Sequence, residues 1–277
     1  MVNRRDYILP ELPEVETTKR GISPFLKNET VVSAVVRNPS LRWPVSAEVD
    51  ELKNNNVLDV IRRGKYIIIQ LDEGSLLIHL GMSGSLRVVD ASVPVRKHDH
   101  IDIVLGSGKV IRYNDPRRFG CLLWTSIWQN HKLISSLGLE PLSDEFTGEF
   151  LFDATRGKRV SVKQFIMNSK IVVGVGNIYA NESLFLAGIH PESVVGEVSE
   201  ERVFELVDVI KSVLCKAIDQ GGTTLKDFVG SDGKPGYSQQ ELHVYGRGGE
   251  ACNKCDSELI EIKQNNRSSV FCGNCQN

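Results

Sequence analysis

Four cysteines near the C-terminus form the clearest chemical pattern in the sequence. They follow the spacing Cys252-x2-Cys255-x16-Cys272-x2-Cys275. Each Cys-x-x-Cys pair can bring two thiolates to one ion, and four thiolates in a tetrahedron are typical of structural zinc. Two disulfide bonds are the alternative. The spacing favours one structural Zn2+ held by a β-hairpin ribbon, with no open coordination position for catalysis.

The expected compartment bears on the choice between zinc and disulfides. No run of apolar residues approaches the ~18 that a membrane helix needs, and no apolar segment marks a signal peptide. We therefore expect a reducing, cytoplasmic environment, which favours zinc. The two remaining cysteines, Cys121 and Cys215, have apolar neighbours and are expected to be small core residues.

Composition limits the kind of partner the protein can have. The 277 residues include 33 Lys and Arg against 35 Asp and Glu, for a net charge of −2. A polycationic protein is thereby excluded, so any nucleic-acid surface must be a local basic patch. One basic cluster lies between residues 153 and 170, where Asp153 is accompanied by Arg156, Lys158, Arg159, Lys163 and Lys170.

Four further motifs occur in order along the chain. They are Pro10-Glu11-Leu12-Pro13-Glu14-Val15-Glu16-Thr17, His79-Leu80-Gly81-Met82-Ser83-Gly84, Asp115-Pro116-Arg117-Arg118-Phe119-Gly120 and Val173-Gly174-Val175-Gly176-Asn177. Together with the cysteines they closely resemble the bacterial formamidopyrimidine-DNA glycosylase family, from Pro10 to the C-terminus. The resemblance implies a base-excision repair enzyme that removes oxidised purines such as 8-oxoguanine and then cleaves the strand.

The resemblance also implies the catalytic residues. The secondary amine of Pro10 would attack the sugar C1′, and Glu11 would protonate the ring oxygen. An α-amino group titrates near ~8, so part of it is neutral at cellular pH. Lys65 would donate a proton near the sugar. Arg267, between the zinc-binding pairs, would contact phosphate and assist the second step of β,δ-elimination.

Pro10 departs from the family pattern because nine residues precede it. A proline nitrogen inside a peptide bond is a tertiary amide and cannot act as a nucleophile. We therefore expect translation to start at Leu9 and this first residue to be trimmed, so that residues 1–9 are a non-native or untranslated extension. The active chain would then begin at Pro10.

DNA contacts are implied in the same way. Met82, Arg117 and Phe119 would fill the space left by the extruded nucleotide, although Met and Phe are more often ordinary core residues. The other implied contacts are His98, Lys158, Lys163 and Asn177. By composition alone, the segment 97–100 is also a possible metal cluster.

These residues need elements that position them. A helix fits residues 12–26, short β-rich runs fill residues 30–124, and helical spacing covers 163–187 and 203–218. A Gly- and Ser-rich segment at 221–237 corresponds to the family's lesion loop. We predict an α+β fold with an N-terminal antiparallel β-sandwich flanked by helices (10–128), a helix–two-turn–helix domain (129–240) and a zinc ribbon (241–277).

Other functions remain open on sequence alone. An endonuclease VIII-type glycosylase for oxidised pyrimidines shares the proline chemistry, and a catalytically silent lesion-binding protein would result if the extension is retained. A generic zinc-ribbon module leaves the β-rich half unexplained. We expect double-stranded DNA with oxidised bases as the partner, no membrane association, a monomer, and a bacterial cytoplasmic location at the nucleoid.

Overall fold

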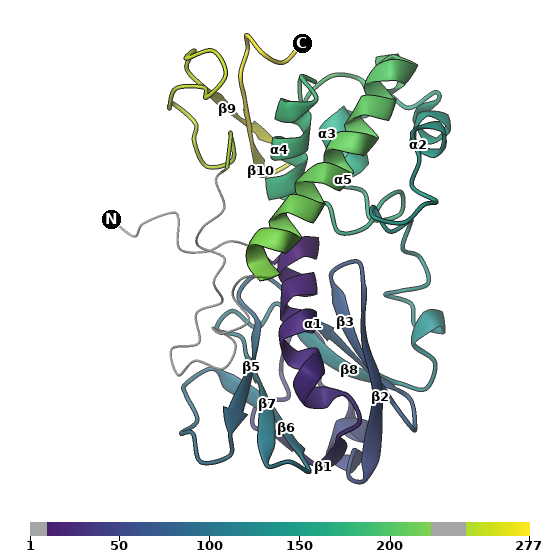
Figure 1. Ribbon diagram of the computed structural model, residues 1–277, viewed down its shortest axis with the longest axis vertical. Helices are drawn as coiled ribbons and strands as arrows, with labels where there is room; N and C mark the ends of the chain where they lie inside the picture. The colour runs from purple at the N-terminus through teal and green to yellow at the C-terminus, as the bar shows by residue number, and fades with distance from the viewer. Residues whose placement is uncertain (1–9, 223–241) are drawn as a thin grey trace. The chain divides into compact units, whose positions relative to one another are not determined.

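The computed structural model describes residues 10–222 and 242–277 (Figure 1). The chain divides into two compact units. Among the described residues, the N-terminal unit contains 10–135 and 218–222, and the C-terminal unit contains 136–217 and 242–277. The expected extension at 1–9, and most of the expected lesion loop at 221–237, lie outside the described residues.

The N-terminal unit is built on eight antiparallel strands in the order β5-β7-β6-β1-β2-β3-β4-β8. Strands β1 and β2, which join the two halves of this order, are paired only at Thr30 with Asn56 and Val31 with Asn55. The strands are β1 Thr30–Val36, β2 Asn55–Arg63, β3 Tyr66–Leu71, β4 Ser75–His79, β5 Ser85–Asp90, β6 Asp99–Leu105, β7 Lys109–Asn114 and β8 Cys121–Thr125.

The two halves of the sheet share one hydrophobic core. Ile67, Ile69 and Ile78 from one half belong to the same buried cluster as Ile101 and Ile111 from the other. A common core requires the halves to face each other, so the predicted antiparallel sandwich is confirmed. Short 3-10 helices at Ala47–Glu51 and Trp128–Asn130 complete the connections.

Helix α1, Leu12–Leu26, has the bounds predicted from the sequence. Pro13 lies in its first turn, where the missing N–H costs no hydrogen bond. Its apolar residues Val15, Ile22 and Leu26 are buried in the sandwich core, and the helix packs against β2, β3 and β5 (Figure 1). The helix start, which carries the proposed nucleophile, is therefore fixed to the sandwich.

The C-terminal unit is helical and ends in a hairpin. Helices α3 and α4 lie on either side of the predicted break at the glycine-containing turn 173–176, but the break is longer than predicted, because residues 167–176 are not helical. Strand β10 packs against α4. The elements are α2 Gly148–Thr155, α3 Val162–Ile166, α4 Asn177–Leu186, a 3-10 turn at Val195–Glu197, α5 Glu200–Gly222 (its last turn lies in the N-terminal unit), β9 Ile260–Gln264 and β10 Arg267–Phe271.

One prediction about the lone cysteines is wrong. Cys121 is fully buried, as expected, but Cys215 is exposed on α5. The sequence places it beside apolar residues, yet helical geometry turns position 215 to solvent while Leu214 and Ile218 face inward. Within residues 10–222 and 242–277, no helix is long and apolar enough to cross a membrane.

Candidate functional site

The four predicted cysteines converge at the base of the β9–β10 hairpin. Their Sγ atoms all lie within 4.8 Å of one another. Sγ separations are 3.9 Å between Cys252 and Cys275 and 3.4 Å between Cys255 and Cys272. Four sulfurs at 2.3 Å from a central zinc would be about 3.8 Å apart, so this set fits a tetrahedral ion.

The thiols also need a cation to ionise together. Hydrogen bonds from Ser257 lower the pKa of Cys255 to about 6. A hydrogen bond with Cys255, burial and the neighbouring thiols raise the pKa of Cys275 to about 12. Clustered thiolates repel one another, and a divalent cation removes that penalty. The donor chemistry therefore matches structural zinc.

Arg267 lies next to the tip of the β9–β10 hairpin. Asn265 and Asn266 both have positive φ, 49° and 60°, as a two-residue type I′ turn requires. Arg267 follows directly, pairs with Gln264 in the ladder and is exposed. Its guanidinium is thus available to an external anion while its backbone is fixed.

Lys163 and Asn177 both bind the residue after Arg267. Nζ of Lys163 donates to the Ser268 carbonyl at 2.7 Å and to Ser269 Oγ at 2.6 Å. Nδ2 of Asn177, the first residue of α4, donates to the same Ser268 carbonyl at 3.0 Å. Lys163 is 2% exposed. The structure therefore brings Lys163, Asn177 and the Arg267 hairpin together, with the lysine inside the protein.

The start of α1 holds two buried carboxyl groups next to Pro10, which is itself buried. Glu11 is the N-cap residue, and it forms a reciprocal capping box with Glu14. In this box, Oε2 of Glu14 accepts the backbone N–H of Glu11 at 2.9 Å. Such a box fixes the direction in which the chain enters the helix. Pro10 and Glu11 are consequently held in a defined position.

Lys65 is held by the turn between β2 and β3. Glu16 on α1 binds Nε of Arg62 at 3.0 Å, and Arg62 donates to the Gly64 carbonyl at 3.0 Å. Burial opposes ionisation of Glu16, but Lys19, Arg20 and Arg62 outweigh it and lower its pKa. This chain of contacts ties the Lys65 turn to helix α1, whose N-cap is Glu11.

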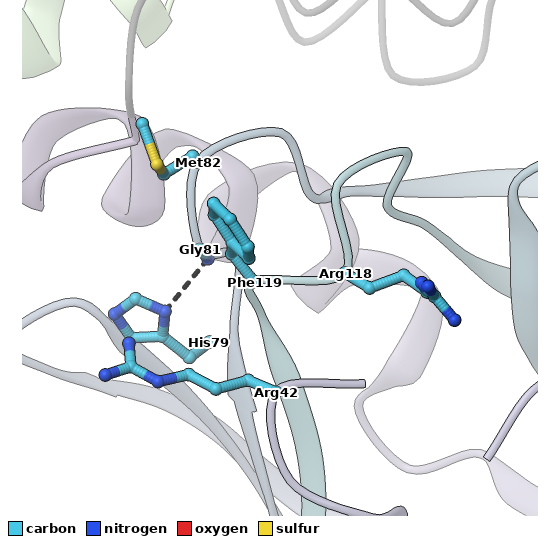
Figure 2. A pocket seen from close by; sticks show the side chains of 6 residues that line it. All are labelled: Arg42, His79, Gly81, Met82, Arg118 and Phe119. Atoms are coloured by element: carbon cyan, nitrogen blue, oxygen red, sulfur yellow. Dashed lines mark hydrogen bonds between the residues drawn. The ribbon is translucent and has the colours of Figure 1, made fainter. Parts of the chain in front are cut away.

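A pocket of about 600 Å3 lies beside the loop that follows β4 (Figure 2). His79 Nδ1 accepts the Gly81 N–H at 2.9 Å, so the proton of the neutral ring is on Nε2. Burial, followed by the charges of Lys65 and Arg42, lowers the pKa of His79 to about 4. His79 is therefore a neutral hydrogen-bond donor at physiological pH. The lining residues are Arg42, His79, Gly81, Met82, Arg118 and Phe119.

Met82 and Phe119 line this pocket from two different loops. Phe119 is 44% exposed and Met82 is partly buried, so neither is a core residue. The guanidinium of Arg117 stacks over the Phe119 ring at 4.8 Å. An exposed aromatic ring, a thioether and a guanidinium at one site suit contact with nucleobases.

Comparison with known proteins assigns the family. Three family models match in order: the formamidopyrimidine-DNA glycosylase N-terminal domain over residues 9–122, the formamidopyrimidine-DNA glycosylase H2TH domain over 137–229, and a zinc finger found in FPG and IleRS over 249–277. The chain belongs to the formamidopyrimidine-DNA glycosylase family. The predicted family, its enzyme class as a DNA glycosylase and the structural zinc are thereby confirmed.

Individual members of the family match nearly the whole chain. The formamidopyrimidine-DNA glycosylase of Photobacterium profundum is 56% identical over 268 residues, which are 97% of this chain and 100% of the relative. That of Yersinia enterocolitica is 54% identical over the same shares. A structure of Lactococcus lactis Fpg with abasic-site DNA aligns with a TM-score of 0.86 at 31% identity, covering 96% of this chain and 99% of that chain.

Two further residues predicted to contact DNA, Lys158 and His98, lie outside the groups of residues described above. Lys158 is exposed in the connection between α2 and α3. His98 is partly buried, and its carbonyl accepts the Asp115 N–H at 3.1 Å. The adjacent His100 is 5% exposed and donates from Nε2 to the Asp115 carbonyl at 2.8 Å. His100 is therefore a structural residue in this glycosylase.

His79 lies within one of the sequence motifs, but the sequence alone predicts no role for it. Its ring packs against Tyr66, whose ring centroid lies 4.8 Å away, and its pKa is lowered by burial and then by the cations Lys65 and Arg42. The one usable signal was the Gly81 two residues later, since a glycine there lets the backbone N–H turn back to the ring. Arg42 and Arg118 were also not predicted, because their place in the pocket depends on contacts between segments that are distant in the sequence.

Proposed function

We propose that this glycosylase excises oxidised purines, 8-oxoguanine and formamidopyrimidines, through a Schiff base on Pro10 and then cleaves the abasic site by β,δ-elimination. The observation that carries the proposal is the start of α1, where a buried Pro10 precedes a buried Glu11 held by Glu14. A carboxyl group beside a secondary amine is the pair that this chemistry needs.

In the proposed reaction, the Pro10 nitrogen forms a bond to C1′ while the bond from C1′ to the base breaks, and the proton released from the nitrogen goes to the departing base. Glu11 gives its proton to the ring oxygen O4′, and the C1′–O4′ bond opens to leave an iminium ion. The iminium withdraws electrons, so the C2′ proton becomes acidic and the 3′-phosphate leaves. Lys65 relays protons at the sugar, and Arg267 binds the phosphate that departs in the second elimination.

This chemistry requires a free amine on Pro10. We therefore extend the proposal to the active form of the enzyme, which begins at Pro10 without residues 1–9. A proline nitrogen in a peptide bond has its lone pair delocalised into the carbonyl. Intact mass of the active native enzyme tests this part, and retention of Met1 would contradict it.

Substrate DNA would be bound by both units. Met82, Arg117 and Phe119 are proposed to enter the duplex and replace the extruded nucleotide, because their side chains form one partly exposed group. His98, Lys158 and Asn177 are proposed to contact the backbone. Lys163 would act indirectly, since its buried ammonium holds the Arg267 hairpin rather than facing solvent.

Oxidised pyrimidines are a second candidate substrate class. One Lactococcus lactis Fpg structure, 33% identical to this chain, is a complex with DNA containing an oxidised pyrimidine. Another Lactococcus lactis Fpg structure is a complex with FAPY-dG DNA, so these two complexes support purines as much as pyrimidines. We also propose that the enzyme works as a monomer in the bacterial cytoplasm, on the nucleoid, where its DNA substrate lies. The boundaries 10–128, 129–240 and 241–277 stay predictions.

Borohydride trapping tests the proposal directly. The enzyme beginning at Pro10 should form a covalent adduct with an 8-oxoguanine duplex on reduction, because borohydride reduces the iminium. The Pro10→Gly variant should lose most of the adduct while still binding abasic DNA. Faster excision of thymine glycol than of 8-oxoguanine opposite cytosine would favour the pyrimidine assignment, and binding without any trapping would favour a silent lesion-binding protein.

A further inference from the structure

Two loops of the N-terminal unit carry the residues proposed to enter the DNA, and one buried carboxylate ties these loops together. The first loop joins β4 to β5 and carries Met82, and the second joins β7 to β8 and carries Arg117 and Phe119. Asp115, which is fully buried, begins the second loop. Its Oδ1 accepts a hydrogen bond of 2.6 Å from the Ser83 hydroxyl of the first loop.

The same carboxylate also fixes the far end of the second loop. Oδ2 of Asp115 accepts the Gly120 N–H at 2.9 Å and the Tyr113 hydroxyl at 3.2 Å. The Ser83 hydroxyl oxygen in turn accepts the Arg117 N–H at 3.1 Å. Neither loop can shift without breaking a hydrogen bond to a buried carboxylate or to its serine partner, which makes displacement costly.

Backbone packing between the loops restricts them further. Gly81 has φ of +63°, and a Cβ on it would lie only 2.5 Å from the Gly120 nitrogen. A Cβ on Gly120 would collide with the Tyr113 hydroxyl and the His79 carbonyl. The two loops therefore touch through backbone atoms at glycine positions and form one rigid surface.

We infer that Ser83 and Asp115 are positioning residues that hold Met82 and Phe119 in the conformation that enters the duplex. The inference rests on the proposed function, in which these side chains replace the extruded nucleotide. Side chains that are already ordered lose their conformational entropy during folding and not during DNA binding. The bridge between Ser83 and Asp115 thus lowers the barrier to opening a base pair.

Ser83→Ala tests the bridge, because it removes one hydroxyl and leaves the glycines in place. We expect kcat/KM for excision of 8-oxoguanine opposite cytosine to fall about tenfold. Cleavage of a preformed abasic site should fall by less than about threefold, because no base pair has to be opened there. Ser83→Thr keeps a hydroxyl and should restore excision. Ser107→Ala, at an exposed serine in the β6–β7 turn, is the matched control and should leave both rates unchanged.

A double-mutant cycle shows whether Ser83 acts through Met82. In a Met82→Ala background, Ser83→Ala should reduce excision less than it does in the wild type. Additive effects, or equal losses on the paired lesion and the abasic site, would overturn the inference. So would a loss of excision that merely follows a loss of folded protein in thermal denaturation. None of these results would affect borohydride trapping by the wild-type enzyme. A lack of trapping would overturn the proposed function instead.

Discussion

The ammonium group of Lys163 on α3 donates a hydrogen bond of 2.7 Å to the backbone carbonyl of Ser268 on β10. The two residues are 105 positions apart in the chain. Ser268 directly follows Arg267, so the position of the hairpin tip depends on a lysine that is itself almost fully buried. Lys163 therefore links helix α3 to the hairpin and so helps to fix the position of the exposed Arg267.

Lys163→Met should uncouple this hairpin. Methionine fills similar space but leaves the Ser268 carbonyl and the Ser269 hydroxyl without their charged donor, at a cost of about 2 kcal/mol in unfolding free energy. We expect strand cleavage at an abasic site to fall at least tenfold, because Arg267 is no longer held. Gel analysis of abasic duplexes and urea denaturation measure the two effects. Lys216→Met, at an exposed position of α5, is the control. Wild-type stability in Lys163→Met would contradict the assigned role.

Zinc removal should disable the same hairpin by a different route. Cys272→Ser removes one of four thiolate ligands, so metal analysis should find less than one zinc per chain and the β9–β10 hairpin should lose its order. DNA cleavage should then fall strongly while the sandwich of the N-terminal unit stays folded. Circular dichroism and metal content provide the readouts.

Cys215→Ser is the matched control for zinc removal. This thiol is exposed on α5 and does not belong to the four-cysteine group, so the variant should keep its zinc and its activity. Equal loss of metal in both variants would mean that the metal is not held by the hairpin cysteines.

The features predicted correctly from the sequence are those set by local spacing. Helix α1 has its predicted bounds because Pro13 and the apolar period of Val15, Ile22 and Leu26 act within a few turns. The zinc ligands follow from two short Cys-x-x-Cys pairs, and the sandwich from the alternation of apolar runs and turns. No tertiary information was needed for any of these.

The features that escaped prediction depend on contacts distant in sequence. Lys163 is buried where it binds the Ser268 carbonyl. The pKa of His79 is lowered first by burial and then by the charges of Lys65 and Arg42, which lie on other segments. The prediction that Cys215 lies in the core is wrong for a geometric reason. Its apolar neighbours in the sequence lie on a different side of the helix. In this protein, the roles of side chains are therefore less predictable from the sequence than the positions of helices and strands.

His79 should make folding stability depend on pH. Its native pKa of about 4 lies below the ordinary 6.5, because of burial and the charges of Lys65 and Arg42. The unfolded chain then binds more protons, so the contribution of His79 is complete above pH 6.5 and is lost as the pH falls toward 4. Its size is about 2 kcal/mol after allowance for solvent screening. Urea denaturation between pH 4 and 7 measures it.

His79→Asn isolates this contribution. The asparagine oxygen can accept the Gly81 N–H as Nδ1 does, but it does not titrate, so stability should vary less with pH than in the wild type. His131→Asn is the control, since that ring is only partly buried and its substitution should change the slope less. Identical pH profiles for His79→Asn and the wild type would refute the neutral, locked imidazole.

Met82→Ala should separate the proposed DNA wedge from the protein core. Met82 is partly buried at the pocket rim, so truncation should cost under about 1 kcal/mol of stability, whereas a core methionine costs about 2–5 kcal/mol. Excision of 8-oxoguanine opposite cytosine should fall about tenfold, because less apolar surface replaces the extruded nucleotide. Single-turnover excision and thermal denaturation measure the two quantities.

Leu58→Ala provides the comparison for an apolar residue without a proposed role. Leu58 is 54% exposed on β2, so its truncation should alter neither stability nor excision. If Met82→Ala unfolds the protein while Leu58→Ala does not, Met82 belongs to the core after all. If Met82→Ala is stable and excises at the wild-type rate, the residue that fills the duplex must be Phe119 or Arg117, which stack on each other 4.8 Å apart.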